Sequence, residues 1–81
     1  MKLLGKWIGD IFVQEEPTGT VNGSNTAFTL SEVPHSNACV ELYLNGLILR
    51  QGTDYSLSGS SITMTTAPVS GSDLYATYIK V

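Results

Sequence analysis

The stretch VELYLNGLILRQ, residues 40–51, decides the fold, because two alternating segments flank an Asn-Gly pair. Asn-Gly between alternating segments is the strongest local signal of a β-hairpin with a two-residue loop. A loop at Asn45 and Gly46 fixes one register, with an aliphatic side and a side that carries an opposite-charge pair. The expected pairs are Val40 with Gln51, Leu42 with Leu49 and Leu44 with Leu47, and on the other side Glu41 with Arg50 and Tyr43 with Ile48.

A second hairpin is expected directly after the first. A loop at Gly59 and Ser60 separates the apolar and polar faces cleanly, and a glycine in the first loop position suits a type II′ turn. A loop one residue earlier mixes the two faces. The pairs expected from this loop are Tyr55 with Met64, Leu57 with Ile62, Ser56 with Thr63 and Asp54 with Thr65.

The rest of the chain continues this pattern of short strands separated by turn-forming residues, which predicts an all-β domain. The longest connection, residues 31–37, favours a crossing from one sheet to another. We therefore expect a small antiparallel β-sandwich, immunoglobulin-like or jelly-roll-like, with a small barrel as the alternative. The expected strands are Thr26–Leu30, Ala38–Leu44, Leu47–Gln51, Asp54–Leu57, Ile62–Thr66 and Asp73–Ile79, and the expected core includes Leu42, Leu44, Leu49, Leu57 and Ile62.

Five fragments in a fixed order resemble a small β module found in virion proteins of tailed phages and prophages. They are TVNGSNTAFTL (20–30), VELYLNGL (40–47), GTDYSLSG (52–59), ITMTTAP (62–68) and GSDLYATYI (71–79). The ordered series carries the resemblance, and no single fragment does.

The resemblance implies a structural part of a virus particle: a tail fibre, a spike, a head fibre or a neck-associated component. It also implies attachment to other virion proteins and a homo-oligomer, with a trimer as the favoured state. The place of such a protein would be the virion, after synthesis in the cytoplasm of the bacterial host. No long shaft or receptor-binding region follows Ile79 in this sequence.

The first sixteen residues differ from the rest. Their apolar residues recur at helical spacing, which predicts an amphipathic helix, and an extended arm is the competing conformation. Gly5 and Gly9 disfavour a helix that has nothing to pack on. We expect residues 1–16 to form an anchoring arm and tether, and residues 17–81 to form the β domain. The residues expected to dock on a partner are Trp7, Ile8, Ile11 and Phe12.

Three uses of this arm remain open. It covers an open part of its own sandwich, it docks into another virion protein or a second copy with its aromatic residues as anchors, or it inserts at a membrane surface. Lys2 and Lys6 make a poor basic face for the third use, so no membrane insertion is expected. The last expected strand adds a second hint of association, because Tyr75 and Ile79 lie on the face opposite Leu74. We expect Tyr75 and Ile79 either to pack under a loop or the arm, or to form a contact between subunits.

Several functions are disfavoured by composition. A net charge of −3 with four scattered basic residues predicts no nucleic-acid partner. His35 is the only histidine and Cys39 the only cysteine, and neither has metal-ligand spacing to another residue. The carboxylates are expected in solvated or turn-capping roles. We expect no metal, no cofactor and no enzyme activity.

A carbohydrate- or receptor-binding module is the alternative from another functional class, because small sandwiches bind sugars by stacking them on aromatic rings. The aromatic candidates are Tyr43, Tyr55, Tyr75 and Trp7. The expected pairing opposes most of them: Tyr55 shares the apolar face with Leu57, and Tyr43 faces Ile48.

Overall fold

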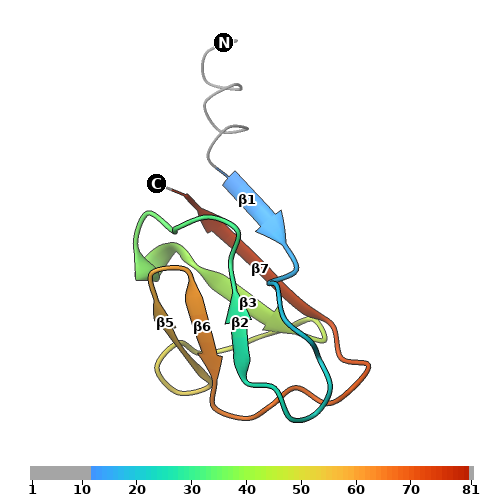
Figure 1. The fold of residues 1–81 in the computed structure, drawn as a ribbon. Coiled ribbons are helices and arrows are strands. Elements are labelled where there is room, and N and C mark those ends of the chain that lie inside the picture. The colour runs from blue at the N-terminus through green and yellow to red at the C-terminus, as the bar shows by residue number, and fades with distance from the viewer. Residues whose placement is uncertain (1–11, 81) are drawn as a thin grey trace.

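The computed structural model describes residues 12–80, which form two antiparallel β-sheets and almost no helix (Figure 1). The all-β class with two sheets is as predicted, and the arrangement is compatible with a small sandwich. The elements are β1 (Phe12–Glu15), β2 (Ala27–Thr29), the 3-10 turn η1 (Asn37–Cys39), β3 (Glu41–Leu44), β4 (Leu47–Ile48), β5 (Tyr55–Ser58), β6 (Ser61–Met64) and β7 (Leu74–Ile79).

One sheet has four strands in the order β1-β7-β3-β4, and the other has three in the order β2-β6-β5. The connection 31–37 leads from β2 in the second sheet to β3 in the first, as its length predicted. Figure 1 shows β1 and β7 side by side, so the two ends of the described chain meet in the four-stranded sheet.

The first hairpin has the predicted loop. Tyr43 pairs with Ile48 and Leu44 with Leu47. Asn45 has φ 53° and Gly46 has φ 85°, and positive φ at both loop positions defines the type I′ turn that Asn-Gly favours.

The returning strand of this hairpin is shorter than predicted. The amide of Leu49 still donates to the carbonyl of Leu42 (2.7 Å), but β4 ends at Ile48. The reason is a turn that begins at Arg50, whose amide donates to the Asp54 carboxylate (2.9 Å) while the Asp54 amide donates back to the Arg50 carbonyl (2.7 Å). Asp54 therefore has the turn role expected of it, and this turn carries the chain toward the second sheet.

The second hairpin also has the predicted loop and pairs. Tyr55 pairs with Met64 and Leu57 with Ile62. Gly59 has φ 59°, and Ser60 is not among the residues with positive φ, which agrees with the expected type II′ turn.

The strand predicted from Ala38 begins instead at Glu41. Residues 37–39 form the turn η1, in which the amide and the thiol of Cys39 both donate to the carbonyl of Ser36, at 3.2 and 3.0 Å. This local hydrogen bonding competes with strand pairing at Ala38, which is exposed.

The core lies between the two sheets. Of the five residues predicted for it, Leu42 and Ile62 are fully buried, and Leu44, Leu49 and Leu57 pack partly buried against them. The alternation along β7 places Leu74, Ala76 and Tyr78 in the core, as expected. The other buried hydrophobic residues are Phe28, Leu30, Val40, Tyr55 and Met64.

Strand β1 changes the prediction for the N-terminal segment. Phe12–Glu15 is extended and pairs with β7, so this part of the expected arm is a sheet strand and not a helix. The β structure thus begins before the boundary expected at Pro17. Beyond β1, Thr18 exchanges two backbone hydrogen bonds with Thr29, the last residue of β2 (2.7 and 2.9 Å), and this bridge joins the two sheets along one edge. Trp7, Ile8 and Ile11 lie outside the described residues.

Candidate functional site

The face of the four-stranded sheet that points away from the core is the candidate site, and it is called the outer face below. Its residues alternate with buried ones along each strand, since successive side chains of a strand point to opposite sides. Its members are Phe12 and Gln14 of β1, Glu41 and Tyr43 of β3, Ile48 of β4, and Tyr75, Thr77 and Ile79 of β7.

One end of the outer face is apolar. Phe12 and Ile79 are direct cross-strand partners, and they are 46% and 40% exposed. Phe12 was predicted as a docking residue of the arm, and Ile79 either as a residue covered by a loop or the arm or as a subunit contact. The sequence placed these two residues in separate segments, but the pairing of β1 with β7 brings them together on one surface.

The middle of the outer face is polar. Gln14, Thr77 and Glu41 form one row across β1, β7 and β3. The Thr77 hydroxyl donates to the Glu41 carboxylate (3.3 Å). This row separates the apolar end from the next row of the face.

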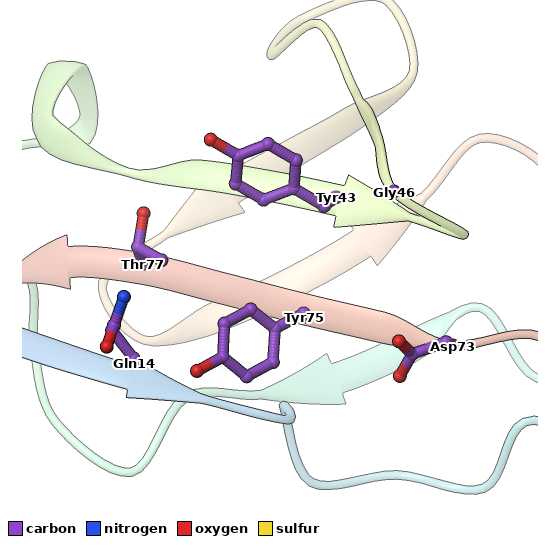
Figure 2. Close-up of a pocket in the computed structure, with 6 residues that line it drawn as sticks. All are labelled: Gln14, Tyr43, Gly46, Asp73, Tyr75 and Thr77. Atoms are coloured by element: carbon purple, nitrogen blue, oxygen red, sulfur yellow. The ribbon is translucent and has the colours of Figure 1, made fainter.

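The next row contains two tyrosines, because β3 and β7 place Tyr43 directly opposite Tyr75. Both are partly buried and line a shallow hollow of about 370 Å³. Figure 2 shows the two rings lying along neighbouring strands. The hollow is called the tyrosine hollow below, and its lining residues are Gln14, Tyr43, Gly46, Asp73, Tyr75 and Thr77.

Glu41 fixes the hydroxyl of Tyr43. The Tyr43 hydroxyl donates to the Glu41 carboxylate (3.0 Å). This hydrogen bond, together with desolvation and the carboxylate charge, raises the pKa of Tyr43, because ionisation would remove the donor and place two negative groups together. The Tyr43 hydroxyl is therefore held toward Glu41 as a hydrogen-bond donor.

Glu15 anchors β1 beneath this face. Its half-buried carboxylate accepts hydrogen bonds from the Tyr78 hydroxyl (2.6 Å), the Ser31 hydroxyl (2.5 Å) and the Ser31 amide (2.9 Å). Burial acts to raise the pKa of Glu15, but the three donors together outweigh it and lower the pKa. The expectation of a solvated or turn-capping role is therefore wrong for Glu15, which ties the strand that carries Phe12 to β7 and to the connection after β2.

The remaining candidates are dispersed. His35 is exposed in its loop, and Cys39 is half-buried at the end of η1. Within residues 12–80, no group of three or more His, Cys, Asp and Glu side chains is placed to hold a metal ion. In the same range, no helix has the length and apolar character needed to cross a membrane.

Among the tyrosine candidates for sugar stacking, Tyr55 is only 2% exposed and belongs to the core. Tyr43 and Tyr75 are the two that the structure brings together on the outer face. Comparison with known proteins adds no relative: no family model, curated protein or solved structure matches this chain.

Proposed function

We propose that this chain is a structural protein of a tailed-phage or prophage particle, a minor tail, fibre, spike or head-associated component that works by binding and not by catalysis. The proposal rests on the resemblance carried by the ordered series of fragments from Thr20 to Ile79. In this proposal the two sheets are an immunoglobulin-like or jelly-roll-like building block, and the protein resides in the virion after synthesis in the host cytoplasm.

One observation of the structure supports an assembly role most directly. Phe12 follows immediately after the apolar residues of the N-terminal segment, and it lies opposite Ile79 on the outer face. Exposed aromatic and aliphatic side chains that adjoin one another are typical of protein–protein contacts. We infer that the Phe12–Ile79 corner is a docking surface, and that the apolar residues of the N-terminal segment bind the same partner.

The small size of the domain is a physical reason for such a contact. A chain of this length buries only about 60% of the surface that it exposes when unfolded, so its core alone gives modest stability. Burying Phe12, Ile79 and the apolar N-terminal residues against another subunit adds to that stability. A closed symmetric oligomer uses the same patch in every copy, and a trimer is the state that we propose.

Glu15 supports the same surface from below. Its three hydrogen bonds hold β1 in register with β7, so the Phe12 side chain is presented at a fixed place and not on a loose tail. Rigid presentation lowers the entropic cost of binding.

Mass spectrometry of purified particles tests the proposal. Particles produced from the genome that encodes this chain would be purified by density gradient and digested with trypsin, which should release the peptide 51–80 between Arg50 and Lys80. We expect this peptide at a constant ratio to the other structural proteins across gradient fractions. A protein that is expressed in the host but absent from the particle fractions would contradict the proposal.

A further inference from the structure

The tyrosine hollow is a second feature of the outer face that assembly through the Phe12–Ile79 corner leaves unused. Tyr75 lies four positions before Ile79 on β7, which places it about 13 Å from that corner at the usual rise of a strand. The polar row of Gln14 and Thr77 lies between them. The two ends of the face can therefore have different partners.

Each of the two tyrosine rings presents a flat aromatic face. Tyr43 and Tyr75 are directly opposite each other on adjacent strands, which places their Cβ atoms about 5 Å apart. In Figure 2 both rings are seen nearly face-on, on the side of the sheet that also carries Gln14 and Thr77. The Tyr43 ring lies over β3, and the Tyr75 ring leans away from it, over the gap between β7 and β1. Ring faces that lie along a sheet offer an apolar platform, while the hydroxyl of Tyr43 stays bonded to Glu41.

Polar groups surround this platform. The Gln14 amide and the Thr77 hydroxyl lie at one side of the hollow, and the Asp73 carboxylate lies at the end near the hairpin loop. They offer both donors and acceptors. A pyranose ring has the matching shape, with flat C–H faces and a rim of hydroxyl groups.

The charge of the residues in and beside the hollow limits the class of ligand that can bind there. The lining contains the Asp73 carboxylate and no basic side chain, and the neighbouring Glu41 is a further carboxylate. Phosphorylated and other anionic ligands are therefore repelled. A twofold contact with a second copy at this point would also bring carboxylates of the two copies near one another, which disfavours a subunit as the occupant.

We propose that the tyrosine hollow binds a neutral saccharide, with one pyranose ring stacked on Tyr75 and its hydroxyls bonded to Gln14 and Thr77. The volume of about 370 Å³ lies within the range of small-molecule sites. The site is open to solvent, so a single sugar ring should bind with a Kd on the order of 1 mM. This activity is independent of the assembly proposed above.

Amide chemical shifts of the full-length protein provide the test. The probes are methyl β-glucopyranoside, methyl β-galactopyranoside and N-acetylglucosamine, titrated separately into the isotope-labelled protein. We expect at least one of them to shift the amides of Tyr43, Gly46 and Tyr75. Affinity should fall at least tenfold in Tyr75→Ala and persist in Tyr43→Phe, which keeps the ring.

Val69→Ala, at an exposed loop residue that does not line the hollow, is the matched control and should bind the sugar as the wild type does. If Tyr75→Ala does not fold, Gln14→Ala replaces it, because Gln14 is exposed, and it should weaken binding several-fold. The proposal is overturned if none of the three sugars shifts these amides, or if the shifts survive in both Tyr75→Ala and Gln14→Ala. Loss of sugar binding with an unchanged solution mass would separate this site from the assembly surface.

Discussion

Gly19→Ala should be among the most damaging single-methyl changes in this domain. Gly19 has φ +152°, and a Cβ there would overlap the Phe28 ring and lie 3.0 Å from the Ala27 carbonyl oxygen. Phe28 is 2% exposed and cannot turn away into solvent. The unfavourable φ costs about 1–2 kcal/mol, and forcing a methyl group into a packed site costs a further 1–3 kcal/mol or so. The sum is about 2–5 kcal/mol.

That loss is large for a domain whose total stability is on the order of 4–12 kcal/mol. Urea unfolding followed by circular dichroism measures it as a fall in the midpoint. Gly71→Ala is the matched control, because Gly71 also has positive φ (+90°) but no atom lies within 4 Å of the added methyl group. Equal losses of stability in the two variants would refute the close approach of Gly19 to Phe28. They would also contradict the packing around the Thr18–Thr29 bridge between the two sheets.

Three further predictions concern the turn and the Glu15 anchor. Gly46→Val should cost about 1–2 kcal/mol in urea unfolding, because a β-branched residue resists the φ of 85° at that loop position; full stability would contradict the turn assignment. Glu15→Gln should lose about 1–2 kcal/mol at pH 7, since Ser31 and Tyr78 would no longer donate to a charged acceptor; an unchanged midpoint would contradict that anchor. Because the folded-state pKa of Glu15 lies below its ordinary value of 4.5, its contribution is complete above pH 4.5 and is lost as the pH falls through the folded-state pKa. The difference in urea midpoint between wild type and Glu15→Gln should therefore shrink on acidification, and a constant difference from pH 7 to pH 3 would disprove the linkage.

The parts of the fold that sequence could predict are those set by neighbours along the chain. Asn45-Gly46 and Gly59-Ser60 specify their turns through backbone conformation, and each turn then fixes the register of both flanking strands. The length of β4 was overestimated because the side chain of Asp54 competes for the Arg50 amide, a contact that apolar alternation does not report.

Strand β1 was ambiguous for a different reason. Apolar residues up to Phe12 have helical spacing, but the strand itself is decided by pairing with β7, at the opposite end of the chain. Glu15 and Tyr78 are also far apart in the sequence, so the hydrogen bond between their side chains could not be predicted from it. Local patterns cannot reveal contacts between such distant segments, since tertiary pairing overrides a short segment's own propensity.

The sequence likewise predicted only some of the neighbours on the outer face. Hairpin pairing placed Tyr43 opposite Ile48, which is correct, and this argued against an aromatic cluster. A central strand has two neighbours, however, and the second neighbour of β3 is β7, which brings Tyr75 to the other side of Tyr43. The paired tyrosines therefore follow from strand order, which the turns alone do not determine.

Assembly through the Phe12–Ile79 corner is the central claim, and solution mass tests it most directly. Light scattering would compare the full-length protein with Ile79→Glu, which places a charge in the corner, and with Val69→Glu, the same change at an exposed loop residue away from it. The account predicts a trimer for the wild type and for Val69→Glu, and a folded monomer for Ile79→Glu. A monomeric wild type, or an Ile79→Glu protein with the mass of the wild-type oligomer, would contradict it.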